Sequence, residues 1–227
     1  MFLVEDYFNS QKVSAEQLDS LLAHGWRHNA TDFYRYSTTL LDSEVVEVMP
    51  LRIRLEKFWP SRSQRRVAAK NRDLEIVVRD AFIDRAKEAM FDRHKQRFKN
   101  NVPDSIYDFL TRRTAVVPCR KKEICAFLGR RLIAANFLGI GRTSTDAVYT
   151  IFEPDESRRS LGTLMILEGI RYSRSVGCRF YYPGYAYHAP SPFDYKKNFA
   201  GAEYYDWESE QWKAYSSSSL QPTASAE

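Results

Sequence analysis

The sequence predicts an α+β protein with a mixed, largely antiparallel sheet and flanking helices. In the second half, several strand-like segments precede one helix and a further strand, which is an α+β order. The 227 residues are 44% hydrophobic and 14% aromatic, so the chain can bury a packed core. No apolar run reaches the roughly 18 residues needed to cross a bilayer. We therefore expect one large or two small folded units, and no membrane partner.

The first half predicts a smaller N-terminal α/β portion. A helix is expected at 14–23, where Ser14 and Gln17 fit a capping box ahead of spaced leucines. An aromatic, extended segment at 26–36 comes next, and alternating residues predict a strand at 45–55.

A short helix and a long helix are predicted next. Ser61 can cap a short helix that follows Pro60. From 73 to 98, apolar residues recur at roughly the 3.6-residue period with charges between them, which predicts a long amphipathic helix. Residues 1–113 would then form an N-terminal basic domain that contains the long helix.

The second half predicts a separate α+β domain over 114–207. A hairpin turn at Gly129 separates its first two strands, and Ser160 is expected to cap its helix. The expected elements are strands at 123–128, 132–138 and 147–152, a helix at 160–175, a strand at 178–187, a helical turn at 194–199 and an edge strand at 204–207. Residues 208–227 are serine-rich and predict a disordered tail.

Positive charge is concentrated in one segment. The net charge is +5, but residues 52–72 hold eight Lys or Arg against the single acid Glu56. Arg62, Arg65 and Arg66 fall at i, i+3 and i+4 of the short helix, and therefore on one face. This face either binds an anion or is simply a solvated basic surface, and the sequence leaves both interpretations open.

The most unusual stretch is YYPGYAYHAPSPFDYKK at 181–197. Pro183 removes a ladder donor and Gly184 allows positive φ, so this apolar strand is interrupted. An interrupted strand inside a sheet can leave a cleft beside it. Tyr181, Tyr182 and Tyr185 would line that cleft; the alternative is ordinary core packing.

The loop RRSLGT at 158–163 lies between a strand and a helix, where free amides and the helix dipole favour anions. It resembles the pyrophosphate loop of Gcn5-related N-acetyltransferases, with Arg159 and Gly162 in matching places. Leu164 stands where a second small residue is usual. The resemblance implies a Gcn5-related, acetyltransferase-like catalytic domain, and makes an acetyl-CoA-dependent N-acetyltransferase the alternative function.

Several chemistries find no support. The sequence has no GxSxG or HExxH motif, and its four histidines are scattered. Cys119, Cys125 and Cys178 form no CxxC pair, so we expect reduced thiols and no metal site. The N-terminus lacks a basic segment before an apolar one, which predicts a cytoplasmic protein without a signal peptide.

A set of motifs, taken together, resembles the arginyl/leucyl-tRNA–protein transferase family of the N-degron pathway. In order along residues 15–207, they are Gly25-Trp26-Arg27, Pro50-Leu51-Arg52-Ile53, SRSQRR at 61–66, Asn71, Ser160-Leu161-Gly162-Thr163, YYxGY at 181–185 and DYKKxF at 194–199. The resemblance implies transfer of arginine or leucine from charged tRNA to the N-terminal α-amine of an acceptor protein. It favours an acceptor with an acidic first residue.

The resemblance also implies which residues form the site. The candidate catalytic residues are Tyr181, Tyr182 and Tyr185. The candidate substrate-binding residues are Arg52, Arg62, Arg65, Arg66, Asn71, Ser160, Gly162, Gly184, Asp194, Tyr195, Lys196 and Lys197. We expect Arg65 and Tyr182 to border one crevice that takes both the tRNA end and the peptide end.

The chain departs from this family in its cysteines. The family usually carries cysteine pairs near its N-terminus that are linked to an iron–sulfur cluster, whereas no cysteine precedes Cys119 here. We therefore expect no cofactor, with aminoacyl-tRNA as co-substrate. A second alternative is a non-catalytic module that binds acidic N-termini or RNA.

Overall fold

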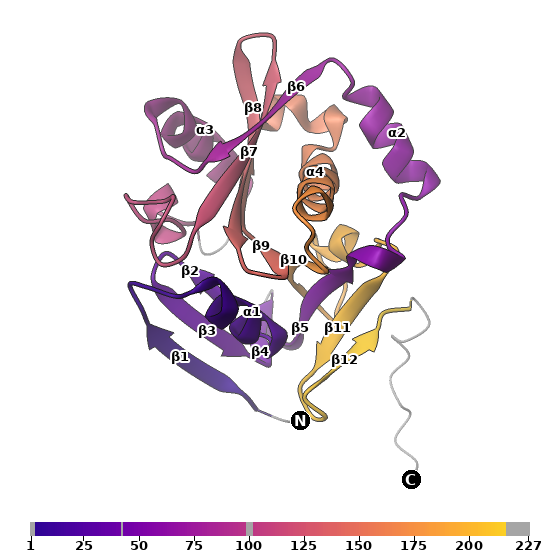
Figure 1. Ribbon diagram of the computed structural model, residues 1–227. Coiled ribbons are helices and arrows are strands. Elements are labelled where there is room, and N and C mark those ends of the chain that lie inside the picture. Colours follow the sequence, from indigo (N-terminus) through magenta and orange to yellow (C-terminus); the bar gives the residue numbers. More distant parts are fainter. Residues whose placement is uncertain (1–2, 42, 99–101, 217–227) are drawn as a thin grey trace.

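The computed structural model describes residues 3–41, 43–98 and 102–216. A small sheet of three strands lies beside a large nine-stranded sheet (Figure 1). The small sheet has the order β1 (Glu5–Asn9), β3 (Asp32–Tyr36), β2 (Arg27–Asn29). The large sheet has the order β12 (Gln211–Ala214), β11 (Ala202–Asp206), β5 (Glu44–Arg54), β10 (Phe180–Tyr187), β9 (Ser144–Phe152), β8 (Arg131–Ile140), β7 (Lys121–Leu128), β6 (Leu74–Asp80), with β4 (Thr38–Leu41) on β5.

All the strand pairs of the large sheet are antiparallel except β9 with β10. The α+β class and the largely antiparallel sheet are therefore confirmed. The helices are α1 (Ala15–Ala23), α2 (Arg62–Lys70), α3 (Arg85–Lys95) and α4 (Leu161–Ser175), with short 3-10 helices η1 (Leu55–Lys57), η2 (Ile106–Asp108), η3 (Pro154–Arg159) and η4 (Asp194–Lys197).

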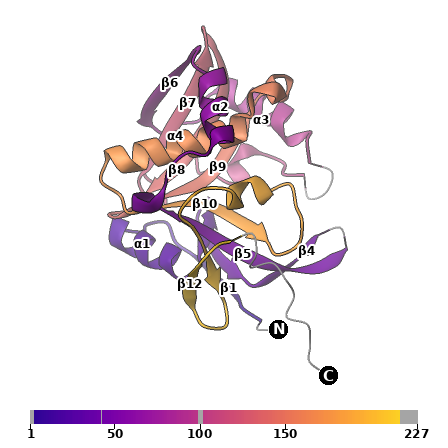
Figure 2. The same cartoon turned by 90° about the vertical axis from the view of Figure 1, so that its right-hand side faces the viewer.

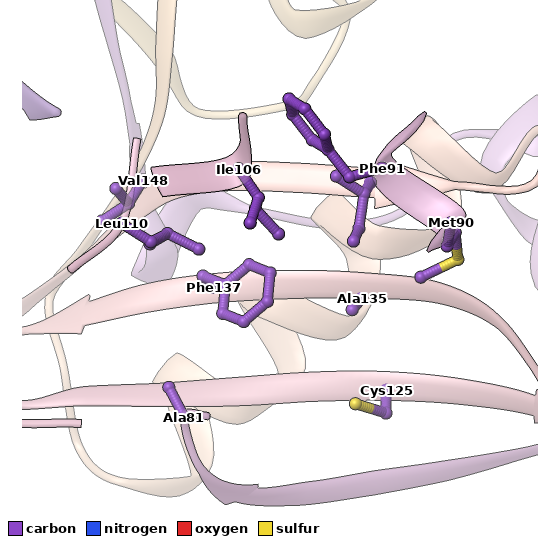
Figure 3. Packing of buried hydrophobic residues seen from close by; sticks show 10 residues of the cluster. Ala81, Met90, Phe91, Ile106, Leu110, Cys125, Ala135, Phe137 and Val148 are labelled. Atoms are coloured by element: carbon purple, nitrogen blue, oxygen red, sulfur yellow. The ribbon is translucent and has the colours of Figure 1, made fainter. Parts of the chain in front are cut away.

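Helices cover both faces of the large sheet (Figures 1 and 2). α4 packs over β8, β9 and β10 on one face, and α2 packs against α4. α3 covers β8 and β9 on the other face, where Phe91 and Met90 meet Phe137 and Ala135 (Figure 3). α1 lies on the same face as α3, because its Leu18 and Leu22 contact Tyr182, whereas the preceding Tyr181 faces α4.

The capping predictions for the first two helices are confirmed. Ser14 with Gln17 and Ser61 with Gln64 each form a reciprocal capping box, in which side chain and backbone satisfy each other's free groups. Ser160 differs from its prediction. It has φ 56° and ψ 48°, and its side chain makes no cap hydrogen bond.

The long helix predicted at 73–98 is wrong. Its first part is strand β6, which pairs with β7 from Leu74 opposite Leu128 to Asp80 opposite Lys122. The β-branched run Ile76, Val77 and Val78 favours a strand, and pairing with β7 outweighs the loose helical period. A helix begins only after Asp84, whose side chain accepts from the amide of Lys87.

The predicted division of the chain has no counterpart in the sheet. β5 and β6 come from before the expected boundary at Arg113, yet they share the large sheet with β7 to β10. The tail expected to be disordered from 208 begins with β12, so β11 is an inner strand; residues 217–227 lie outside the described residues. In the described part of the chain, no helix combines the length and apolar character needed to span a membrane.

Close packing between α4 and β10 gives a first testable prediction. A Cβ added to Gly169 would lie 2.5 Å from Cε2 of the buried Tyr181 ring. We expect Gly169→Ala to lower the free energy of unfolding by about 1–3 kcal/mol, measured by urea denaturation, because the added methyl group forces the buried ring or α4 to shift. Helix propensity alone predicts a gain of up to about 1 kcal/mol, and observing that gain would contradict this packing.

Candidate functional site

The candidate site lies where the two parallel strands of the sheet part. β10 pairs with β9 only from Phe180 opposite Ser144 to Tyr182 opposite Asp146. Pro183 then offers no amide, and Gly184 has φ of 100°. β10 also shifts register against β5 at this point. From Ala147 onward, the edge of β9 that faces β10 therefore makes no ladder with β10.

Arg27 of β2 reaches this point from the small sheet. Its Nη1 donates to Oδ1 of Asp146, and its Nη2 donates to the carbonyl oxygen of Ala147 at 2.6 Å. Asp146 is fully buried, and its Oδ2 lies 3.7 Å from Nε2 of His28 without a hydrogen-bond partner. Burial raises the pKa of Asp146, although the neighbouring Arg27 opposes this shift. Arg27 thus occupies the first free position on the edge of β9.

Lys196 of η4 reaches the same place from the other side. Its Nζ donates to the carbonyl oxygen of Tyr185 at 3.1 Å. Burial, together with the charge of Arg27, lowers the pKa of Lys196 to about 7. A Cβ on Gly184 would lie 3.2 Å from this Nζ, closer than an ordinary contact, and 3.7 Å from Nη2 of Arg27, while the φ of 100° itself favours glycine. The opening between the strands therefore holds two basic groups.

The three predicted tyrosines do not share one surface. Tyr181 is buried against α4, and Tyr182 is buried on the opposite face against α1, where burial raises its pKa to about 12. Only Tyr185 lies near Lys196; its hydroxyl donates to the carbonyl oxygen of Gly25 at 2.6 Å, and its ring packs edge-on against the rings of Tyr34 and Tyr36. These positions correct the expectation that all three line a cleft.

The N-terminus of α4 borders the opening through η4. A Cβ on Gly162 would lie 3.4 Å from the hydroxyl oxygen of Tyr195, so Tyr195 covers the first turn of α4. Arg159, which matched the pyrophosphate-loop pattern, forms ion pairs with Asp73 and Glu156. Its charge is therefore already paired within the protein, which weakens the argument from the pyrophosphate-loop pattern for CoA binding.

α2 is attached to this region by two buried amides. Nδ2 of Asn71 donates to the carbonyl oxygen of Arg159 at 2.9 Å, and Nε2 of Gln64 donates to that of Asn198, just after η4, at 2.9 Å. Asn71, predicted to bind substrate, thus positions the helix. Arg62, Arg65 and Arg66 are exposed, and none of them has a carboxylate partner among the described residues. The predicted basic face exists, on the side of α2 opposite Gln64 and Asn71.

Other predicted binding residues serve the local fold. Arg52 pairs with Glu203 at 2.6 Å and lies over the rings of Phe180 and Trp212, away from α2. Asp194 accepts from the amide of Ser191 and pairs with the buried Lys197 at 2.8 Å, which shapes η4. Arg65 and Tyr182 also do not meet, because Tyr182 packs on the face of the sheet opposite α4, against which α2 lies. This separation corrects the crevice expected between them.

The cysteines do not fit an iron–sulfur cluster. Cys119 lies 3.9 Å from Nε2 of His28, Cys125 belongs to the α3 core, and Cys178 lies against the α4 core. They are the only three in the sequence. Within the described ranges, no group of three or more His, Cys, Asp or Glu side chains is arranged to hold a metal ion.

Two residues of the opening were missing from the predicted set. Arg27 belongs to the Gly25-Trp26-Arg27 motif but had been given no role, and Asp146 went unnoticed. A carboxylate directly before the apolar run AVYTIF is a signal for Asp146, because a charge in a buried strand needs a partner.

Comparison with known proteins places this site in a family. Residues 79–206 match the family model "Arginine-tRNA-protein transferase, C terminus". An aspartate/glutamate leucyltransferase of Leptospira interrogans is 27% identical, over 85% of this chain and 76% of that protein. An aspartate/glutamate leucyltransferase of Afipia carboxidovorans is 30% identical, over 82% of this chain and 76% of that protein.

Among solved structures, FemX aligns with a TM-score of 0.47 at 10% identity, over 85% of this chain and 65% of that chain. The family match covers more than half of the chain, and the Afipia carboxidovorans relative supports it over most of both proteins. The chain belongs to the arginine-tRNA-protein transferase family and is an aminoacyltransferase.

Proposed function

We propose that this protein transfers leucine or arginine from charged tRNA to the N-terminal α-amine of a protein that begins with Asp or Glu. The observation that carries this proposal is the opening between β9 and β10, where Lys196 and Arg27 meet at Gly184. The relatives are named aspartate/glutamate leucyltransferases, which supports leucine as the donor residue and an acidic acceptor. The element order β7, β8, β9, η3, α4, β10 also supports a Gcn5-related acetyltransferase-like fold.

The reaction joins an amine and an ester. The acceptor nitrogen attacks the ester carbonyl carbon, the C–N bond forms, and the bond from that carbon to the ribose oxygen of the tRNA breaks. The α-amine has a pKa near 8, so it is partly neutral at pH 7 and needs little activation. Holding amine and ester in contact can supply most of the acceleration. No covalent enzyme intermediate and no iron–sulfur cluster are needed.

Lys196 is suited to carry the proton in this step. With a pKa of about 7, its amine is neutral in a large fraction of molecules at neutral pH. It can accept the proton that the attacking amine loses, and can return it to the ribose oxygen as that oxygen leaves. Arg27 supports this role, because its charge helps to keep the pKa of Lys196 low.

The basic face of α2 would hold the tRNA. Arg62, Arg65 and Arg66 present three cations on the outer side of α2, whose opposite side is bonded to the loops at η4 and the start of α4. Contacts between arginines and phosphates position a nucleic acid without reading its sequence. The donor ester would then reach Lys196, while the acceptor's acidic side chain finds excess positive charge in the same opening.

A transfer assay tests the proposal directly. Purified protein is incubated with tRNA charged with labelled leucine or arginine and with matched peptides that begin with Asp, Glu or Ala. We expect label on the Asp and Glu peptides and little on the Ala peptide. No transfer from either tRNA to any peptide would refute the proposal. Binding of the tRNA without turnover would favour a non-catalytic module instead.

Lys196 and its neighbour Lys197 provide a second prediction, because replacing each of them should change the stability of the protein in opposite directions. Between about pH 7 and 10.5, the unfolded chain binds a proton at Lys196 that the folded chain does not bind. The charge on Lys196 therefore destabilises the folded state fully below pH 7. This effect shrinks as the pH rises and is absent above pH 10.5. Lys196→Met should therefore raise the free energy of unfolding at pH 7 by about 0.5–2 kcal/mol. The gain should shrink toward pH 10, while transfer falls about 100-fold or more.

Lys197→Met is the matched control. It removes the partner of Asp194 at a buried position, so it should lower the free energy of unfolding at pH 7. Urea denaturation at several pH values, combined with the transfer assay, measures both variants. If Lys196→Met destabilises the protein as much as Lys197→Met does, then Lys196 is a structural residue and the proposed proton carrier is wrong.

A further inference from the structure

Trp59 is exposed although its neighbours are firmly packed. Its side chain is 66% exposed, between η1 and α2. On one side, Phe58 is buried against Phe199, and its carbonyl oxygen accepts from Nη2 of Arg174 at 3.2 Å. On the other side, Pro60 fixes the backbone that leads into the capped helix. A single exposed apolar side chain is common on protein surfaces, so what distinguishes Trp59 is the positive charge of the segments around it.

Five arginines belong to the segments around this ring. Arg62, Arg65 and Arg66 come after it on α2. Arg174, which donates to the carbonyl oxygen of the preceding Phe58, lines a pocket of about 330 Å³ with Arg179 and Phe180. None of these five arginines has a carboxylate partner in the described part of the chain, and all are exposed. We call Trp59 with these five arginines the Trp59 platform.

The pocket is not purely basic, because Arg54 and Glu56 also line it. These two form a pair with each other at 3.6 Å, and Arg54 also pairs with Glu203. Their charges are largely satisfied within the protein. The arginines without a carboxylate partner therefore make the surface around Trp59 positively charged. A polyanion that also has flat rings would match this surface.

We propose that the Trp59 platform binds the single-stranded 3′ end of the tRNA, with a base stacked on Trp59 and the phosphates held by the flanking arginines. This inference rests on the proposed function and adds a residue and a surface to it. An exposed aromatic ring between cations is the arrangement by which proteins hold single-stranded nucleic acid, because every base has a face that stacks. Stacking on a ring does not depend on which base is bound, and this suits a 3′ end that different tRNAs share.

The platform is also placed to deliver that end to the opening. Gln64, in the first turn of α2, is bound to the carbonyl oxygen of Asn198, and Phe58 contacts Phe199. Both partners come directly after η4, which carries Lys196. A strand that stacks on Trp59 therefore has only the η4 region to cross before its terminal ester meets Lys196.

The test compares binding of two RNAs to the full chain. The probes are a labelled leucine-accepting tRNA, either intact or with its single-stranded 3′ end removed, titrated by fluorescence anisotropy. We expect Trp59→Ala to weaken binding of the intact tRNA about tenfold and to leave binding of the trimmed tRNA unchanged. Trp59→Phe should retain most of the affinity. Tyr7→Ala removes a similarly exposed ring from β1 and should change neither value.

Salt dependence separates the ring from the charges. Arg62→Ala should reduce the slope of log affinity against log salt by about 0.7, whereas Trp59→Ala should leave that slope unchanged. Arg130→Ala, at the exposed turn between β7 and β8, is the matched control and should not alter the slope. Equal effects of Arg62→Ala and Arg130→Ala would mean that phosphates bind without a defined site, and would overturn the proposal.

The remaining outcomes are distinguishable from failure of the proposed function. If wild-type protein transfers leucine while Trp59→Ala binds the intact tRNA normally, the platform is refuted and the function stands. If Trp59 is needed for binding but no transfer occurs, the platform stands as an RNA surface and the function fails. If wild-type protein binds neither tRNA, both are refuted.

Discussion

The constraint on which the site depends is the early end of the parallel ladder between β9 and β10. Pairing stops after Tyr182 and Asp146 because Pro183 has no amide and Gly184 takes a positive φ. The sheet remains continuous, since β10 keeps its antiparallel partner β5 beyond the break. The fold thus frees backbone edges in the middle of a sheet without losing a strand, and the side chains of Arg27 and Lys196 bond to carbonyl groups there.

The buried charges at the opening are less completely paired than those elsewhere in the core. Lys87 of α3 and Glu123 of β7 are both fully buried and pair at 3.1 Å, and the more exposed Arg79 and the amide of Phe82 also donate to Glu123. That cluster is satisfied within the protein. At the opening, Arg27 pairs with the carboxylate of Asp146, one of whose oxygens has no hydrogen-bond partner, and Lys196 has no carboxylate partner among the described residues. Burying unbalanced charge opposes folding, and such groups gather where a protein binds or reacts.

The sequence predicted the local features of this fold better than its division into parts. Capping boxes, the β7–β8 hairpin and the basic face of α2 arise from residues close in sequence, and all three are present. The strand β6 was mistaken for helix because Leu74, Val77 and Val78 fit the helical spacing while Leu74, Ile76 and Val78 fit strand alternation, and only pairing with β7 decides between them. Arg27 and Asp146 are 119 residues apart, so no local pattern could join them.

Alternation along β10 explains why the candidate tyrosines separate. Successive side chains of a strand point to opposite faces, so Tyr181 and Tyr182 must enter different cores. The irregularity at Gly184 then redirects the rest of the strand, and Tyr185 joins the aromatic rings of β3 near Lys196. The basic helix comes to the same place by another route, because Asn71 and Gln64 bind main-chain carbonyl groups of the loops around α4 and η4. Those bonds fix the backbone, while Arg62, Arg65 and Arg66 keep no carboxylate partner among the described residues, as the proposed uptake and release of a polyanion requires.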